Sequence, residues 1–267
     1  MSVGARKPTL TVIAGPNGAG KTTLVKGLEA DGHSLGHYVN PDEIAAALGG
    51  DPRGREFRAG REAIHQARAH IAAGESFTQE TTLTGAWAKT LMKEAKTAGF
   101  TVRMVYIGVE DLAVSQARVD DRVEKGGHAV PAADQRRRFD RSFDNLAPAS
   151  RIADSAVILD NSRSATPYVL VAEVERGQVR PMATEAPAWA HRSLANLEQR
   201  SRMAKTTQQA GRVAASALKA ADSIKDPARR AAAADLAAKV AGKARAPTQG
   251  RPGPAAGPKR GGGDRQR

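Results

Sequence analysis

The amino-acid sequence predicts an α/β fold with a mostly parallel sheet and helices on both of its faces. Short apolar runs alternate with helix-like segments over roughly the first 180 residues, and the run TLTVIAG at 9–15 ends in glycine, as a buried strand does. Strands that alternate with helices favour parallel pairing through right-handed crossovers. Ligands bind at the carboxyl ends of the strands in such a sheet, so the residues that follow each strand are the candidates for function.

The order of the elements follows from the spacing of the apolar residues. Buried strands are short and rich in β-branched residues, whereas amphipathic helices repeat apolar residues every three or four positions. Strands are expected at 9–15, 37–40, 76–81, 101–109 and 155–162, and a hairpin at 168–179 with its turn at Arg176 and Gly177. Helices are expected at 21–30, from Pro41 onward, and at 55–74, 85–98, 111–125 and 132–146.

The uneven distribution of charge predicts a boundary near residue 185. The whole sequence has a net charge of +13, but residues 190–267 hold 17 Lys and Arg against 5 Asp and Glu, which leaves the preceding residues nearly neutral. The front of the chain is therefore expected to be a globular domain. We expect this domain at 1–185, an Ala-rich basic helical extension at 186–245, and a disordered Gly/Pro/Arg-rich tail at 246–267.

The composition also predicts the compartment. The sequence has no cysteine, which excludes disulfides and thiolate metal sites and suits a reducing environment. The N-terminus has no apolar segment of signal-peptide length, and no run approaches the ~18 apolar residues of a membrane span. We therefore expect a cytoplasmic protein without a membrane span.

The glycine-rich segment GPNGAGKT connects the first expected strand to the first expected helix. It fits the phosphate-binding P-loop pattern G-x-x-x-x-G-K-[ST] at every fixed position and in the required context. Loop amides and the helix N-terminus would surround phosphate oxygens, Lys21 would reach the β- and γ-phosphates of ATP, and Thr22 would bind Mg²⁺. The predicted nucleotide-binding residues are Gly15, Pro16, Asn17, Gly18, Ala19, Gly20, Lys21, Thr22 and Thr23.

This segment predicts the P-loop NTPase fold but leaves the reaction open. A GTPase would carry an N/T-K-x-D motif, and an ABC ATPase would carry an LSGGQ-like signature and an apolar strand that ends in Asp-Glu. The sequence contains neither motif, and its nearest strand, VILD at 157–160, continues into Asn161. We therefore expect phosphoryl transfer to a bound acceptor rather than hydrolysis.

Asp42, in the segment VNPDEI, has two compatible interpretations. Asn40, Pro41 and Glu43 form the pattern of a helix N-terminus, so Asp42 suits the first helical turn. Asp42 also follows a strand that we expect beside the P-loop strand, where a carboxylate would accept the proton of an acceptor hydroxyl. We expect Asp42 to be the general base.

Arginines are concentrated on the helices expected at 111–125 and 132–146, which are joined by Gly126 and Gly127. Two arginine-bearing helices with a glycine hinge would form a lid that brings guanidinium groups to the transferring phosphate. The alternative is a solvated helix face whose arginines pair with nearby acids. The predicted lid arginines are Arg118, Arg122, Arg136, Arg137 and Arg138.

Other polar residues are candidates for substrate binding. Glu80 and Thr81 end the strand at 76–81, and we expect them to contact the acceptor, although a polar loop exit would have the same composition. His128 is a third candidate for substrate contact. The histidines without metal-ligand spacing are interpreted as structural or surface residues: His33, His37, His65 and His70.

Six segments occur in this order between residues 9 and 162: AGPNGAGKTTL, VNPDEIA, FTQETTL, RVDDRVEKGGHAVP, RRRFDRSFDNL and ILDNS. Together they resemble the zeta-toxin family of P-loop kinases, in particular the small chromosomal zeta-like proteins. The resemblance implies an ATP- and Mg²⁺-dependent kinase that phosphorylates a sugar hydroxyl of a nucleotide sugar such as UDP-N-acetylglucosamine. It also implies a small antitoxin protein as a candidate partner.

The same resemblance implies roles for single residues. Asp42 matches the catalytic base, Lys21 and Thr22 match the phosphate and magnesium residues, Glu80 matches an acceptor contact, and Arg122 matches an arginine that closes over the transferring phosphate. A second such arginine falls near His128, where this chain has a histidine. Either the arginines at 136–138 take its role or the substrate differs.

The basic tail supports a second hypothesis, a nucleic-acid-associated ATPase or polynucleotide kinase that uses the tail to contact the phosphate backbone. Against this hypothesis, residues 190–267 contain no aromatic side chain on which bases would stack. Weak contact with nucleic acid or an acidic surface through the tail is compatible with either activity. In a third hypothesis the protein only binds ATP, which orders the fold. This hypothesis does not explain Asp42 and the arginines.

Overall fold

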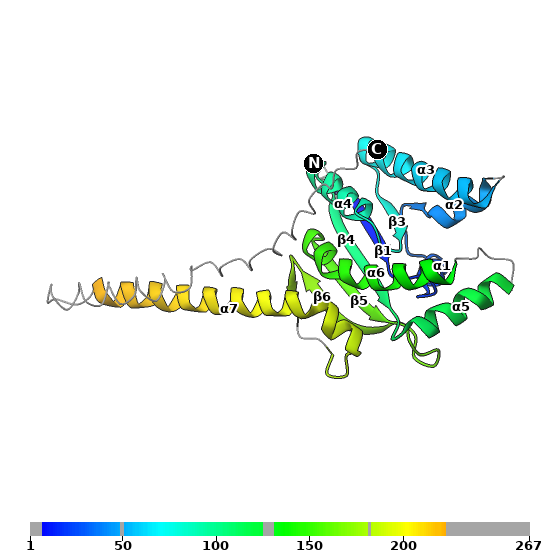
Figure 1. The fold of residues 1–267 in the computed structure, drawn as a ribbon. Coiled ribbons are helices and arrows are strands. Elements are labelled where there is room, and N and C mark those ends of the chain that lie inside the picture. Colours follow the sequence, from blue (N-terminus) through cyan, green and yellow to red (C-terminus); the bar gives the residue numbers. More distant parts are fainter. Residues whose placement is uncertain (1–6, 49–50, 125–130, 181–182, 223–267) are drawn as a thin grey trace, which may run out of the picture. The chain divides into compact units, whose positions relative to one another are not determined.

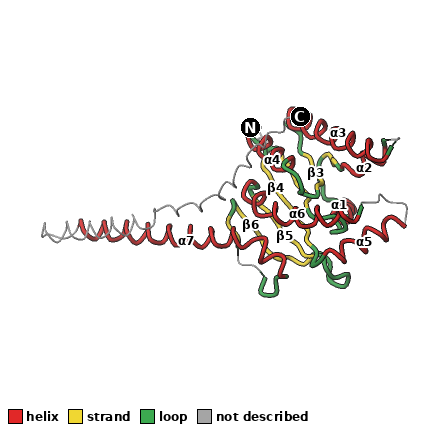
Figure 2. Tube along the Cα trace, viewed as in Figure 1, coloured by secondary structure: helices red, strands yellow, loops and turns green. Residues whose placement is uncertain are grey.

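The computed structural model describes residues 7–48, 51–124, 131–180 and 183–222. Within these residues one seven-stranded sheet carries helices on both faces, as Figures 1 and 2 show. This architecture confirms the predicted α/β fold with a mostly parallel sheet. The strands are β1 (Thr9–Ala14), β2 (His37–Val39), β3 (Phe77–Thr81), β4 (Thr101–Gly108), β5 (Ser155–Asp160), β6 (Val169–Glu175) and β7 (Gln178–Val179).

The helices are α1 (Lys21–Ala30), α2 (Pro41–Ala47), α3 (Pro52–Ala73), α4 (Trp87–Thr97), α5 (Leu112–Glu124), α6 (Ala132–Ile152) and α7 (Ala188–Asp222). The prediction that α6 ends at residue 146 was wrong, because the helix continues through Pro148 to Ile152. A proline removes one helical hydrogen bond, but Leu146 and Ala149 are buried against the sheet and hold the helix beyond it. None of the helices in the described ranges combines the length and the apolar character that a bilayer crossing requires.

The strand order is β2-β3-β1-β4-β5-β6-β7, with β2 to β5 parallel and the β6–β7 hairpin antiparallel at one edge. β3 lies beside β1, so the expectation that β2 neighbours the P-loop strand was wrong. Burial explains the order: the first four residues of β3 are buried, whereas only Val39 is buried in β2. The central position therefore goes to the strand with both faces covered.

The strand register brings the carboxyl ends of β2, β3 and β1 to one edge of the sheet. Val39 pairs with Gln79, and Ile13 pairs with Glu80 in the neighbouring strand. The P-loop after β1, Glu80 in β3 and the start of α2 after β2 consequently meet at this edge. The physical reason is parallel pairing, which places the ends of successive strands together.

Alternate residues of the strands pack into two apolar layers. On one face, β1, β3, β4 and β5 pack against α3, α4, α6 and the beginning of α7, with Leu10, Tyr106 and Leu91 among the fully buried side chains. On the other face, Ile13 and Ile107 pack with Val25 of α1. The two layers hold the P-loop between a fixed strand and a fixed helix.

The structure divides into two compact units, residues 1–202 and 203–267. The first unit contains the beginning of α7, where Trp189, Leu194 and Leu197 are buried in the core. The Trp189 ring lies directly on Gly108, since an added Cβ there would be 2.4 Å from it, and Trp189 Nε1 donates to Asp160 Oδ1 at 3.0 Å. This unit therefore extends past the predicted boundary at 185.

The second unit is described as far as Asp222, where its residues belong to α7. This observation covers the first part of the predicted helical extension at 186–245. The rest of that extension and the predicted tail at 246–267 lie outside the described residues, as do Gly126, Gly127 and His128.

Candidate active site

The P-loop begins at Gly15, directly after β1, and ends where α1 starts at Lys21. Gly15 has φ 144°, and a Cβ added there would lie 2.1 Å from the carbonyl oxygen of Ile107. Gly20, the N-cap of α1, has φ 93°, and no side chain caps the helix. Because the first amides of a helix have no partner within it, α1 presents donors and its positive dipole end to an anion at this point.

Residues distant in sequence hold the P-loop carbonyl oxygens. Ser115 Oγ donates to the carbonyl of Asn17 at 2.6 Å, Asn161 Nδ2 to that of Ala19 at 2.9 Å, and Tyr168 Oη to that of Gly20 at 3.0 Å. With these carbonyls bound to neighbouring elements, the P-loop is held in place from α5, from the residue after β5 and from the residue before β6; these contacts are called the brace of the P-loop. The sequence did not predict this set of contacts.

Arg118 belongs to the same brace. Its Nη1 donates to the carbonyl of Asn161 at 2.7 Å and approaches that of Gly18 at 3.4 Å. Arg118 also lines the cavity described below. Of the predicted lid arginines, this one contacts the P-loop backbone.

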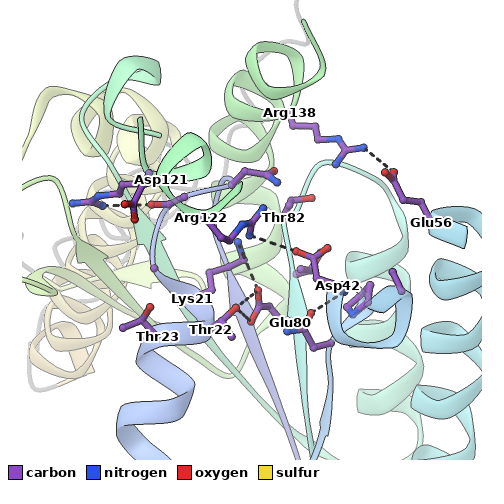
Figure 3. A pocket seen from close by; sticks show the side chains of 18 residues that line it. Lys21, Thr22, Thr23, Asp42, Glu56, Glu80, Thr82, Asp121, Arg122 and Arg138 are labelled. Carbon is purple, nitrogen blue, oxygen red and sulfur yellow. Dashed lines mark hydrogen bonds and ion pairs between the residues drawn. The ribbon is translucent and has the colours of Figure 1, made fainter. Parts of the chain in front are cut away.

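Lys21 is buried, and its ammonium group is held at the base of the site. Nζ donates to the carbonyl of Pro16 at 3.0 Å and lies 3.9 Å from Glu80 Oε1, with both side chains less than 9% exposed. A buried charge is costly unless it is paired, and here the P-loop and Glu80 supply the partners. Figure 3 shows Lys21 and Glu80 facing each other across the floor of the site.

Glu80 is the residue on which most polar contacts converge. Thr22 Oγ1 lies 3.2 Å from Oε1 and 3.0 Å from Oε2 of this carboxylate, and the Tyr38 hydroxyl donates to Oε2. Burial, followed by the negative charge of Glu80, raises the pKa of Tyr38 well above its usual range, so Tyr38 remains a donor. Asn40 Nδ2 in turn donates to Tyr38 Oη at 3.1 Å.

Asp42 lies in the first turn of α2 and also lines the cavity. Its backbone amide donates to Asn40 Oδ1 at 2.9 Å, which caps α2. Its carboxylate lies at the rim of the cavity, 3.8 Å from Arg122 Nη1 and with 56% of the side chain exposed. The cap fixes the turn, and the turn presents the carboxylate toward Arg122, as Figure 3 shows.

The structure separates the predicted lid arginines into two groups. Arg122 and Arg138 line the cavity with Arg118, and Arg138 Nη2 lies 3.9 Å from Glu56 Oε2. Arg136 and Arg137 are exposed, do not line it, and Arg137 pairs with Asp134 at 2.8 Å on their own helix. His128 and the predicted glycine hinge lie outside the described residues.

These residues surround a cavity of about 520 Å³ at the carboxyl edge of the sheet. P-loop, α2, β3, α5 and α6 all contribute to its wall, and the predicted substrate residue Thr81 is part of it. The lining residues are Asn17, Gly18, Gly20, Lys21, Thr22, Thr23, Asn40, Pro41, Asp42, Ala45, Glu56, Glu80, Thr81, Thr82, Arg118, Asp121, Arg122 and Arg138.

The cavity contains a donor set that suits a hard divalent cation. Mg²⁺ prefers oxygen ligands, and P-loop proteins hold it with the loop Ser or Thr and a strand-end carboxylate. Thr22 Oγ1 and the carboxylate of Glu80 lie next to each other at the phosphate end of the cavity. The residues present therefore fit the metal that the P-loop implies.

Comparison with known proteins adds a family and a relative. Residues 10–146, just over half of the chain, match the AAA domain family (AAA_33). An uncharacterised protein of Haemophilus influenzae is 35% identical over 117 residues, which cover 43% of this chain and 81% of that protein.

Two solved structures are similar to the chain at low sequence identity. A chain of the AvrRxo1-ORF1:-ORF2 crystal structure with ATP is 18% identical, with a TM-score of 0.52, and the match covers 88% of this chain and 77% of that chain. A chain of the PezAT chromosomal toxin–antitoxin system of Streptococcus pneumoniae is 19% identical, with a TM-score of 0.45, over 63% of this chain and 72% of that chain. The first of these shows a shared fold. The match from β1 into α6 identifies the family: the chain belongs to the AAA domain family.

Proposed function

We propose that the chain is an ATP- and Mg²⁺-dependent kinase that transfers the γ-phosphoryl group to a hydroxyl of a small molecule. The observation that supports this most is one cavity that brings Lys21 and Thr22 of the P-loop together with Asp42 and Arg122. Phosphoryl transfer depends on positioning and charge neutralisation more than on covalent catalysis. A phosphate cradle that faces a carboxylate and a guanidinium group has the groups that this reaction needs.

In the proposed reaction, the acceptor oxygen attacks the γ-phosphorus, and the bond from this phosphorus to the β,γ-bridging oxygen breaks to release ADP. Asp42 takes the proton of the acceptor hydroxyl. Lys21 and Arg122 place positive charge beside the phosphoryl oxygens, where negative charge is redistributed in the transition state. The exposed rim position of Asp42 leaves room for the acceptor beside it.

Thr22 and Glu80 would hold the Mg²⁺ ion, which neutralises charge on the phosphates when bound. This role for Glu80 differs from the acceptor contact that the zeta-toxin resemblance implies. It rests on the two contacts between Glu80 and Thr22, at 3.0 and 3.2 Å. Tyr38 supports the role, because its hydroxyl donates to one carboxylate oxygen and so orients the group.

The acceptor that we propose is a nucleotide sugar such as UDP-N-acetylglucosamine, and the candidate protein partner is a small antitoxin. Both rest on the zeta-toxin-like segments of the sequence. The cavity supports an acceptor with phosphates of its own, because Arg118, Arg122 and Arg138 line it beyond the P-loop lysine. Thr81 and Thr82 add hydroxyl groups that suit a sugar.

A transfer assay with ATP labelled at the γ-phosphate tests the proposal. UDP-N-acetylglucosamine, other nucleotide sugars and oligonucleotides with 5′-hydroxyl ends are offered as acceptors to the wild-type chain. We expect label in the nucleotide sugar and, on Asp42→Asn, a fall in kcat of about 10²–10⁴-fold with ATP binding retained. Glu43→Gln is the matched control, because Glu43 is the next residue of the same helical turn and does not line the cavity.

Two outcomes would contradict the proposal. Full activity in Asp42→Asn would remove Asp42 from the role of general base. Transfer to oligonucleotide ends in place of small molecules would favour the polynucleotide kinase hypothesis.

A further inference from the structure

A cluster of potential metal ligands lies at the amino ends of β2 and β3, away from the cavity at their carboxyl ends. His37 is the first residue of β2, His70 lies in the last turn of α3, and Glu75 lies in the connection from α3 to β3. They form the only group of three or more such residues found in the described part of the chain. The sequence interpretation of His37 and His70 as structural or surface residues did not consider this cluster.

The distances within the cluster match those between ligands of one ion. His70 Nδ1 lies 3.0 Å and His37 Nε2 lies 3.4 Å from the same carboxylate oxygen, Glu75 Oε2, and all three ligand atoms lie within 4.8 Å of one another. Tetrahedral ligands with bonds of about 2.0–2.2 Å are about 3.3–3.6 Å apart. The two distances to Glu75 are close to this spacing, and the exposed His37 ring can turn out of its stack with His70 so that both nitrogens point at one cation.

The two imidazole rings lie against each other in a stack. They stack with centroids 4.3 Å apart and planes 11° from parallel, and the His70 ring also packs at 5.5 Å from the ring of Phe77, which is fully buried. His70 is held by this contact, whereas His37 and Glu75 are about half exposed. One fixed ligand and two accessible ones give an open site that solvent can complete.

We propose that His37, His70 and Glu75 bind a divalent metal of the zinc class. Two imidazole nitrogens and one carboxylate oxygen are a donor set that suits Zn²⁺, and water takes the remaining position. The hard ion Mg²⁺ prefers oxygen ligands, so this site and the proposed Mg²⁺ position at Thr22 select different metals. The site is independent of the proposed kinase activity.

A metal at this position links three segments that are otherwise connected by loops. It joins the start of β2 to the end of α3 and to the residue two positions before β3. β2 is only three residues long and lies at the edge of the sheet, and its other end leads into Asn40 and Asp42. We therefore expect metal binding to stabilise the edge of the sheet rather than to take part in the reaction.

Equilibrium dialysis of the tag-free full chain against ZnCl₂ tests the site, with the bound metal measured by elemental analysis. We expect one saturable zinc per chain. His37→Ala, His70→Ala and Glu75→Gln should each weaken binding by at least about tenfold. The matched controls are His33→Ala and His65→Ala, which remove exposed histidines outside the cluster and should bind zinc as the wild type does.

Thermal unfolding gives a readout that does not depend on activity. At a free zinc concentration of about 100 times the wild-type Kd, we expect the melting temperature of the wild type to rise by about 5–10 °C, and that of Glu75→Gln to rise by at most about half as much. Glu75 is half exposed and its substitution leaves the core intact, so a smaller shift in this variant reports the ligand itself.

Three results would overturn the proposal. They are no saturable zinc binding by the wild type, unchanged binding in all three cluster variants, or equal loss in the two control variants. The last result would show that zinc binds to surface histidines in general.

Discussion

Asp42 uses its backbone for the helix and its side chain for the cavity. The cap by Asn40 and the carboxylate that faces Arg122 exist in the same turn, so the position of Asp42 at a helix start is compatible with the proposed role as general base. Tyr38 is different, because the sequence did not single it out. An aromatic residue inside a short strand is normally interpreted as a packing residue. The hydrogen bond from Tyr38 to Glu80 depends on a strand whose residue lies 42 positions further along the chain.

Tyr106 carries a prediction about stability at alkaline pH. Its side chain is fully buried, its hydroxyl lies 3.1 Å from Ser142 Oγ, and burial raises its pKa well above the ordinary tyrosine value of 10.0. Below pH ~10 both the folded and the unfolded chain keep the proton, so the contribution to stability is complete. Above pH ~10 only the unfolded chain releases it, and stability falls by about 1.4 kcal/mol for each pH unit.

Urea unfolding of the wild type and Tyr106→Phe at several pH values between about 8 and 11 checks this. The Tyr106→Phe variant has no hydroxyl to lose a proton at position 106. As the pH rises past 10, the unfolding free energy of the wild type should therefore fall relative to that of the variant. All other ionisable groups are present in both chains, so their contributions cancel in this difference. A difference that stays constant across this range would contradict the prediction.

At the scale of elements, the P-loop depends on close contact between backbones. Gly15→Ala would place a Cβ 2.1 Å from the carbonyl oxygen of Ile107 at a φ of 144°. We expect the variant to lose at least about 2 kcal/mol of unfolding free energy and to lose ATP binding, because the loop must move away from β4. Urea unfolding and a nucleotide-binding titration measure the two effects.

Gly60→Ala in α3 is the matched control. An added Cβ there meets nothing within 4 Å, and the residue is in a helix, so we expect a gain of about 0.5–1 kcal/mol and unchanged ATP binding. If both alanine variants behaved alike, backbone contact would not be the reason for glycine in the loop.

The elements themselves were largely predictable, because their signals are local. The limits of α1 matched the prediction at both ends, since a P-loop defines its start and a charged turn its end. The position of β3 between β2 and β1 was not predictable from spacing, because it depends on which strand has both faces covered. The extension of α6 past Pro148 likewise reflects burial against the sheet rather than local propensity.

At the scale of the whole molecule, the compact unit that ends at Arg202 predicts where the chain can be shortened. A chain of residues 1–202 should keep the melting temperature of the first unit and the proposed transfer activity. A chain of residues 1–185 should be strongly destabilised or fail to fold, because it lacks Trp189, Leu194 and Leu197 of the core. Removing a single buried Trp or Leu already costs about 2–5 kcal/mol.

Thermal unfolding and the transfer assay on both shortened chains test this prediction. A stable chain of residues 1–185 would show that charge alone, and not packing, marks the end of the unit. Loss of transfer in a well-folded chain of residues 1–202 would instead assign the basic segment a part in the reaction.

Charge distribution and packing place the boundary differently for a physical reason. Lysines and arginines indicate which residues face solvent. Because α7 is basic from its beginning, the charge pattern places the boundary before this helix. The apolar residue at position 189 precedes the first of those charges, the residues at 194 and 197 lie among them, and only tertiary contacts show that all three are buried. The cluster of His37, His70 and Glu75 could not be predicted from the sequence for the same reason, because a 22-residue helix and a strand bring its members together.

The contact between Trp189 and Gly108 gives the protein a built-in optical probe. Gly108 follows Ile107, whose carbonyl group touches Gly15, and the indole is bonded to Asp160, the neighbour of Asn161 in the brace of the P-loop. Two short chains of van der Waals contacts and hydrogen bonds therefore connect one fluorophore to the loop expected to bind phosphate. Since the only other indole in the sequence is Trp87, the emission of Trp189 in a Trp87→Phe background should follow nucleotide entry without any added dye.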